Sequence, residues 1–228
     1  MERKNILFFL DLEGTILNEK TGDFEEENLN KLLKEIDELE KCTDAKVNIH
    51  IVSPILSEQV EQIVDKIDTT IMRYNRENNK KLNIIEGATA YFTDGSLFKI
   101  RDDRISKFPE SDRLVADGGA SGKKKYVQSW CEVYGDKALM SIYCGNGRND
   151  IQAMEYIKKT KNGLVVCPKN SRTKVRKISD FTSEKTDING TIEGLEVIVN
   201  TIKNKKEMQV EDKEKIIERE IELNEDER

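Results

Sequence analysis

A short apolar run near the start of the chain ends abruptly on acidic residues. Residues 6–17 read ILFFLDLEGTIL, so the apolar run is followed by Asp11 and, two positions later, by Glu13. An uninterrupted apolar run of this length is typical of a strand that is covered on both faces. In an open α/β sheet, ligands bind at the carboxyl edge of such strands. We therefore interpret the two carboxylates as part of a functional site.

The remainder of the chain alternates short apolar segments with longer amphipathic ones. The apolar segments predict strands over residues 5–11, 46–52, 138–144 and 163–167, with shorter strands between residues 82 and 101. Apolar residues spaced three and four apart predict helices over residues 25–41, 57–77, 122–135, 149–163, 171–181 and 189–204. This alternation predicts an α/β fold with a mostly parallel sheet and helices on both of its faces.

The composition fits a soluble globular domain, because apolar and charged residues each make up 36% of the 228 residues. The net charge of −6 argues against non-specific binding to nucleic acid or to an anionic membrane. No stretch approaches the roughly 18 apolar residues of a membrane span, and MERKN leads directly into the first predicted strand without room for a signal peptide. We therefore expect a cytoplasmic protein with no membrane partner.

The spacing of the cysteines and the single histidine argues against a zinc site and against a Ser-His-Asp triad. The four cysteines contain no CxxC pair, which indicates reduced thiols and argues against a zinc site. A Ser-His-Asp triad would have to use His50, which is the only histidine and lies inside a predicted buried strand. We interpret His50 as a packed core residue.

Three more polar motifs follow the first one, each at the end of a predicted strand or at the start of a predicted helix. They are Ser53 in HIVSP, Lys123 in SGKKKYV, and GNGRND at residues 145–150. With DLEGT at residues 11–15, they resemble in order the motifs of the haloacid dehalogenase (HAD) superfamily of phosphohydrolases, in particular its Cof-type branch. The resemblance covers about residues 6–199 and implies a Rossmannoid three-layer sandwich around a mostly parallel sheet.

Phosphoryl transfer explains why these residue types occur together. A carboxylate such as Asp11 can attack phosphorus and form an aspartyl-phosphate, while Glu13 can act as general acid and base. Mg²⁺ is a hard cation that prefers oxygen ligands. The resemblance implies catalytic roles for Asp11, Glu13, Ser53 and Lys123, substrate binding by Gly14, Thr15, Ser53 and Asn149, and a Mg²⁺ site of Asp11, Glu13, Asn146 and Asp150.

The third motif offers three consecutive lysines, of which one is expected at the site. Helical register favours Lys123, because it leaves Val127 and Trp130 on the packed face of the helix. We interpret Lys124 and Lys125 as surface charge.

Two residues depart from the motifs of the family. Glu13 stands where a second Asp is usual, and it keeps the charge on a side chain that is one methylene longer. Asn146 stands where the family has an acid that binds Mg²⁺. Because the amide carries no charge, metal affinity should be lower.

Many relatives carry a cap domain between the second and third motifs, but predicted helix and short strands fill most of that stretch here. We expect a HAD-like domain over residues 1–204, with a short β insert at about 82–121 in place of a cap. The charged C-terminal tail over residues 205–228 is expected to be helical or disordered. An uncapped site is open and suits large substrates.

The sequence therefore predicts a Mg²⁺-dependent phosphatase that hydrolyses a phosphate monoester at an open site. Its partner would be a phosphorylated substrate, and macromolecular substrates are included. The net charge does not indicate binding to nucleic acid, but a phosphorylated nucleic-acid end stays among the candidate substrates. The alternative is a catalytically degenerate HAD-like protein that binds phosphate as a regulatory module. Asn146 favours this alternative, whereas an intact Asp11 opposes it. A third interpretation is a small-molecule phosphatase whose cap comes from a second chain.

Overall fold

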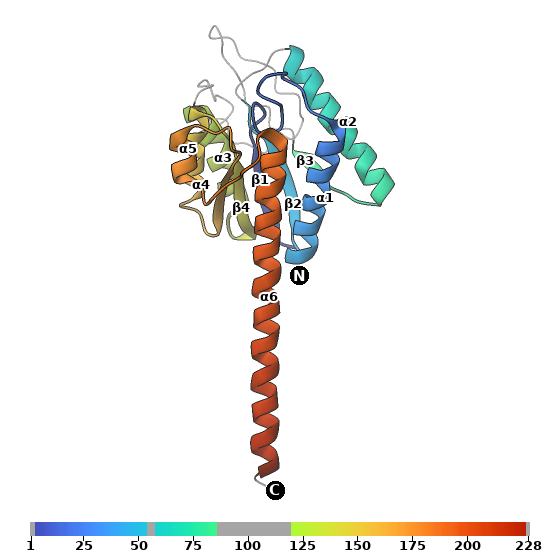
Figure 1. The fold of residues 1–228 in the computed structure, drawn as a ribbon, viewed down its shortest axis with the longest axis vertical. Coiled ribbons are helices and arrows are strands. Elements are labelled where there is room, and N and C mark those ends of the chain that lie inside the picture. The colour runs from blue at the N-terminus through green and yellow to red at the C-terminus, as the bar shows by residue number, and fades with distance from the viewer. Residues whose placement is uncertain (1–2, 54–57, 86–119, 227–228) are drawn as a thin grey trace.

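Six parallel strands form the centre of the computed structural model, which describes residues 3–53, 58–85 and 120–226 (Figure 1). The strands are β1 (Asn5–Leu10), β2 (Lys46–Ile51), β3 (Asn83–Ile85), β4 (Ala138–Cys144), β5 (Gly163–Cys167) and β6 (Phe181–Thr182). Their order across the sheet is β3-β2-β1-β4-β5-β6, and every neighbouring pair is parallel. The order reverses between β1 and β4, where doubly wound folds open a ligand crevice outside the carboxyl ends of their strands.

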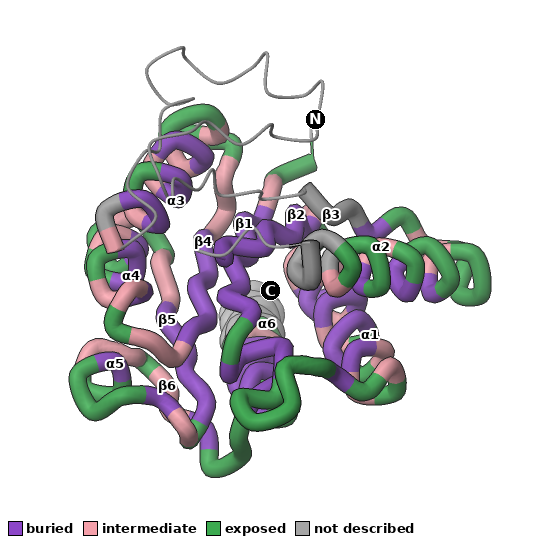
Figure 2. The backbone as a smooth tube through the Cα atoms, turned by 90° about the horizontal axis from the view of Figure 1, so that it is seen from above, coloured by how far each residue is buried: buried purple, intermediate pink, exposed green. Residues whose placement is uncertain are grey.

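Helices cover both faces of this sheet. They are α1 (Glu26–Thr43), α2 (Glu58–Asn78), α3 (Ala120–Tyr134), α4 (Ile151–Ile157), α5 (Thr173–Ile178) and α6 (Asp187–Asp226). One apolar cluster joins the sheet to α1, α2 and α6, and a second joins its other face to α3, α4 and α5. Figure 2 shows the strands buried between these two groups of helices. The three-layer α/β fold predicted from the sequence is confirmed.

The predicted helices differ from the observed ones mainly at their ends. The helix predicted over residues 149–163 ends at Ile157, where the Thr160 hydroxyl donates to the Ile157 carbonyl at 2.7 Å. The helix predicted to end at residue 204 continues to Asp226, since the sequence between them contains no glycine or proline. Its C-terminal half extends well beyond the rest of the molecule (Figure 1). The cap-replacing insert falls mostly on residues 86–119, outside the described residues.

The histidine lies in the core, as the sequence predicted. His50 is fully buried; its Nδ1 lies 3.1 Å from the Tyr126 hydroxyl, and its ring packs against Phe9 and Trp130. Burial lowers the pKa of His50 to about 3, so the ring stays neutral. All four cysteines are free thiols. In the part of the chain that the structure describes, no helix is long and apolar enough to cross a membrane.

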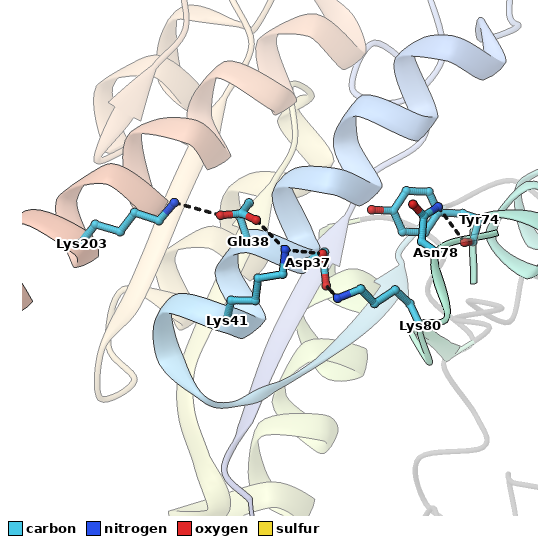
Figure 3. Close-up of polar contacts among 7 residues, drawn as sticks. All are labelled: Asp37, Glu38, Lys41, Tyr74, Asn78, Lys80 and Lys203. Atoms are coloured by element: carbon cyan, nitrogen blue, oxygen red, sulfur yellow. Dashed lines mark hydrogen bonds and ion pairs between the residues drawn. The ribbon is translucent and has the colours of Figure 1, made fainter. Parts of the chain in front are cut away.

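A network of charged side chains connects α1 to α6 and to the residues that follow α2 (Figure 3). Asp37 pairs with Lys41 at 2.9 Å and with Lys80 at 2.6 Å, and its side chain is only 8% exposed. Glu38 pairs with Lys41 at 2.7 Å and with Lys203 of α6 at 2.9 Å. Asp37 is thus the buried member of the network, and both of its carboxylate oxygens have a cationic partner.

We expect Asp37→Asn to lower the free energy of unfolding by about 1–2 kcal/mol. A nearly buried carboxylate with two cationic partners contributes more to stability than one in an exposed ion pair. The matched control is Glu27→Gln, which breaks an exposed pair with Lys31 at 2.8 Å on the same helix. That control should cost less than about 0.5 kcal/mol. Urea denaturation followed by circular dichroism measures both variants, and equal losses would contradict the interpretation.

Candidate active site

The carboxyl ends of the central strands bring the first, second and fourth motifs to one edge. The Asp11 N–H donates to the Cys144 carbonyl at 3.0 Å, which extends the pairing of β1 and β4 by one residue. On the other side of β1, the Val52 N–H donates to the Leu10 carbonyl at 2.7 Å, and Ser53 follows directly. Parallel neighbours in this register end at the same level, so the loops that follow them begin side by side.

Lys123 connects two carboxylates at this edge. Its Nζ lies 2.6 Å from Oδ1 of Asp11 and 2.6 Å from Oδ1 of Asp150, and all three side chains are buried. The lysine belongs to the first turns of α3, which pack against the sheet through the second apolar cluster. Lys124 is half-buried and Lys125 is exposed. Of the three lysines, the structure therefore places Lys123 at the site, in agreement with the predicted register.

The electrostatics of this triad follow from its burial. Burial raises the pKa of Asp11 to about 7, the charge of Asp150 adds to the rise, and Lys123 opposes it. Burial also lowers the pKa of Lys123, but the charges and hydrogen bonds of Asp11 and Asp150 outweigh it and raise that pKa to about 12. Lys123 thus stays protonated between two acids. A further positive charge in the cavity would favour the ionised form of Asp11.

Asp150 is held on both of its carboxylate oxygens. Oδ1 accepts hydrogen bonds from Lys123 at 2.6 Å and from the Tyr143 hydroxyl at 2.8 Å. Oδ2 accepts from the backbone N–H groups of Asn146 at 3.1 Å and Gly147 at 2.8 Å. Asp150 is fully buried and positions the loop that carries Asn146, so its role as a direct metal ligand stays a prediction. The hydrogen bond from Tyr143 to Asp150 was not predicted.

A cavity of about 440 Å³ opens over Asp11. Predicted site residues that line it are Asp11, Glu13, Ser53, Asn146 and Asn149, and Arg172 joins them from the loop after β5. Glu13 is exposed there, whereas Ser53 is buried. The cavity therefore combines a carboxylate pair with hydroxyl and amide groups.

Gly14 and Thr15 do not belong to the lining of this cavity. Thr15 is fully buried, and its carbonyl accepts the Thr191 hydroxyl at 2.9 Å. Gly14 packs so closely against Asn146 that a Cβ on it would lie 2.0 Å from Nδ2 of the amide. Its φ of +66° also favours glycine. Both residues shape the loop after β1, and their predicted contact with substrate stays a prediction.

Two residues that were not predicted hold the loop after β1 in place through hydrogen bonds. Nδ2 of Asn170 donates to the Gly14 carbonyl at 3.1 Å and to Oδ1 of Asp187 at 3.1 Å. The same carboxylate accepts the Glu19 N–H at 3.2 Å. Asn170 follows the predicted strand 163–167, so its position after a strand could have indicated it. Asp187 lies far along the chain, at the start of α6, and no local pattern marks it.

The residues of the cavity fit a magnesium ion, although they do not form a dense metal cluster. Over the described residues, no group of three or more His, Cys, Asp or Glu side chains is placed to hold a metal ion. Mg²⁺ needs only one or two protein carboxylates, since it keeps several waters and binds substrate phosphate. Asp11, Glu13 and Asn146 offer carboxylate and amide oxygens of this kind.

No family model and no curated protein matches the chain. The chain is similar to the cobalt-bound deoxy-D-mannose-octulosonate 8-phosphate phosphatase from Haemophilus influenzae (12% identity, 89% of this chain, 90% of that chain, TM-score 0.46). It is also similar to the 3-deoxy-D-manno-octulosonate 8-phosphate phosphatase from Moraxella catarrhalis in complex with magnesium, phosphate and KDO (15%, 87%, 86%, TM-score 0.43). A haloacid dehalogenase-like hydrolase from Bacillus subtilis is a third such structure (17%, 87%, 90%, TM-score 0.46). At these identities and TM-scores, the function has to be inferred from the side chains of the site itself.

The close packing of Gly14 against Asn146 can be tested with two alanine variants. Gly14→Ala and Gly22→Ala both place a side chain at positive φ, near +66° and +68°, which costs about 1–2 kcal/mol. Only at Gly14 does the new Cβ meet another side chain, because nothing lies within 4 Å of a Cβ at Gly22. We expect urea denaturation to show a larger loss for Gly14→Ala, by about 1–3 kcal/mol. A loss no greater than that of Gly22→Ala would contradict the tight contact.

Proposed function

We propose that this protein is a HAD-type phosphohydrolase, of the Cof-type branch, that cleaves a phosphate monoester through an aspartyl-phosphate on Asp11. The observation that carries the proposal is the buried Lys123, held between Asp11 and Asp150 beneath a cavity that Glu13 and Ser53 line. Transfer of a phosphoryl group requires a positioned nucleophile, a fixed positive charge and donors for the phosphate oxygens. Asp11, Ser53 and Asn149 line the cavity, and the buried Lys123 contacts Asp11 from within the protein.

In the first step, a carboxylate oxygen of Asp11 attacks phosphorus, and the bond from phosphorus to the substrate's ester oxygen breaks. Glu13 gives its proton to that oxygen, so a neutral alcohol leaves. Ser53 and Asn149 are the donors to the phosphate oxygens, and Lys123 keeps Asp11 oriented. Glu13 suits this role because its side chain is exposed and lines the cavity.

In the second step, Glu13 takes a proton from a water molecule as the water oxygen attacks the phosphorus of the aspartyl-phosphate. The bond from phosphorus to Asp11 breaks, which releases inorganic phosphate and restores the free carboxylate. Asp11, Glu13 and Asn146 are the residues that would hold Mg²⁺, and the ion when bound would offset the repulsion between carboxylate and phosphate.

Replacement of the nucleophile is the direct test of this mechanism. We expect Asp11→Asn to lower kcat on 4-nitrophenyl phosphate with Mg²⁺ by about 10³-fold or more, because an amide does not attack phosphorus. The fold should survive, since Lys123 keeps its ion pair with Asp150. Beryllium fluoride with Mg²⁺, a mimic of the aspartyl-phosphate, should bind the wild type and not the variant.

The control for this variant is Asp44→Asn, an exposed aspartate whose left-handed backbone (φ +52°) an asparagine also tolerates. Its kcat should equal that of the wild type. Thermal unfolding of both variants shows whether the fold is kept. Turnover by a folded Asp11→Asn protein at the wild-type rate would rule out Asp11 as the nucleophile.

The second candidate function is a phosphate-binding or regulatory protein that has lost turnover, and Asn146 is the observation that favours it. The amide lines the cavity where a carboxylate would strengthen a metal site, and its backbone N–H is fixed by Asp150 at 3.1 Å. A weakened Mg²⁺ site would leave phosphate binding and abolish chemistry. Asp11 and Lys123 argue for the enzyme, since a protein that only binds phosphate needs no buried nucleophile.

Replacing Asn146 by the aspartate that is usual in the family distinguishes the two candidate functions. We expect Asn146→Asp to tighten Mg²⁺ binding by about tenfold or more in calorimetric titration, because the ion gains a charged ligand. Without Mg²⁺ the variant should be less stable than the wild type, since the new carboxylate joins Asp11 and Asp150 at the same edge; saturating Mg²⁺ should recover this loss. A Glu13→Asp, Asn146→Asp double variant should bind the ion at least as well.

The phosphatase activity of these variants decides between the two candidate functions. A weak wild-type phosphatase should become faster on 4-nitrophenyl phosphate when Asn146 becomes Asp. A robust wild-type rate that falls in Asn146→Asp would mean that the site is adapted to the amide, and the degenerate interpretation would be wrong. Folded proteins that bind Mg²⁺ but show no turnover in any variant would support the binding protein.

A further inference from the structure

A second, shallow recess adjoins the cavity over Asp11. It is lined by Gly147, Arg148, Asn149 and Arg172, and we call it the arginine recess. Gly147, Asn149 and Arg172 also line the cavity itself, so the two spaces share a wall. A ligand whose phosphate lies over Asp11 can therefore extend into the recess without crossing the protein.

The two arginines that border the recess have no acidic partner among the residues that the structure describes. Arg148 and Arg172 are both exposed, and neither side chain takes part in an ion pair or hydrogen bond there. Many other cations of the surface are paired, as Lys158 is with Asp180 at 2.7 Å. The backbone fixes the position of Arg172, because its N–H donates to the Asn146 carbonyl at 3.0 Å. Two exposed arginines that no described acid neutralises thus border the recess.

Charge changes sign across the mouth of the site. Glu13 and Glu19 come from the loop after β1, whereas Arg148 and Arg172 come from the loops after β4 and β5. Because β1, β4 and β5 are successive neighbours in the sheet, the edge runs from negative to positive in this order. An anionic ligand would be oriented with its remaining negative groups toward β5, away from the carboxylates.

We propose that the arginine recess binds a second anionic group of the substrate, so that the preferred substrates are phosphate monoesters that also carry a carboxylate or a second phosphate. The inference rests on the proposed phosphohydrolase function and names its substrate class. Arginine forks match the oxygens of carboxylate and phosphate alike. Neighbouring strands lie about 4.8 Å apart, so one or two strand spacings put the two anionic groups about 5–10 Å from each other.

Turnover of two matched substrates tests the preference. In 4-carboxyphenyl phosphate and 4-carbamoylphenyl phosphate the second group has the same shape but differs in charge. The wild type should favour the carboxylate by about tenfold in kcat/KM, and Arg148→Gln and Arg172→Gln should each reduce this ratio about three- to fivefold. The control is Arg176→Gln on α5, an exposed arginine that does not line the recess and should leave the ratio unchanged. 1,4-Phenylene bisphosphate shows whether a phosphate replaces the carboxylate.

Binding of ligands that cannot be hydrolysed separates the recess from the chemistry. By isothermal titration, 4-phosphonobutyrate should bind the wild type about tenfold more tightly than butylphosphonate, and Arg148→Gln should remove most of this difference. Binding of butane-1,4-diphosphonate shows whether a second phosphonate can take the place of the carboxylate. Arg176→Gln again serves as the control.

The outcomes distinguish the two levels of the proposal. Arginine-dependent tight binding without turnover of any aryl phosphate would support the recess and overturn the hydrolysis. Turnover with no preference for the charged substrate, or with the same preference in all variants, would overturn the recess and leave the hydrolysis standing. Neither turnover nor arginine-dependent binding would overturn both.

Discussion

The ammonium group of Lys123, buried between Asp11 and Asp150, is the interaction on which the rest of the site depends. Removing one partner of a buried ion pair costs about 3–5 kcal/mol, whereas apolar residues in place of the whole set would often be neutral or stabilising. Stability alone therefore does not explain why the triad lies at the carboxyl edge of the sheet, beneath a polar cavity. The proposed role of Asp11 as a nucleophile, which needs a fixed counter-charge, accounts for it.

The position of the triad comes from both layers of helices as well as from the sheet. Leu10 of β1 lies opposite Cys144 of β4, so the loops that carry the two carboxylates begin at the same level. Burial raises the pKa of Tyr143 well above its usual range, which keeps the hydroxyl protonated and able to donate to Asp150. Lys123 enters from α3 on one face, and Asp187 at the start of α6 holds the loop after β1 from the other. Packing of either helix layer thus acts directly on the site.

Local patterns predicted the strands and the buried lysine but not the residues that support them. The strands 5–11 and 138–144 were within one residue of β1 and β4, because a strand covered on both faces must be apolar throughout. The helix predicted over 171–181 is in fact α5 followed by β6, a strand of two residues that is too short to show a period. Asp187 and Tyr143 meet the site through tertiary contacts that no spacing along the chain encodes, whereas Asn170 at least follows a predicted strand.

The amide at Asn146 and the two arginines of the recess have related electrostatic consequences. A carboxylate at position 146 would attract a metal ion, whereas Arg148 and Arg172 supply positive charge from the protein itself, on the loops after β4 and β5. Under the proposed function, part of the charge compensation for an anionic ligand therefore passes from a bound cation to fixed side chains. Interactions with a remote anionic group can also stabilise the transition state, if they hold the phosphate in line with Asp11. A substrate with a second anion would then tolerate a weaker metal site, which relates the departure at Asn146 to the charge of the substrate.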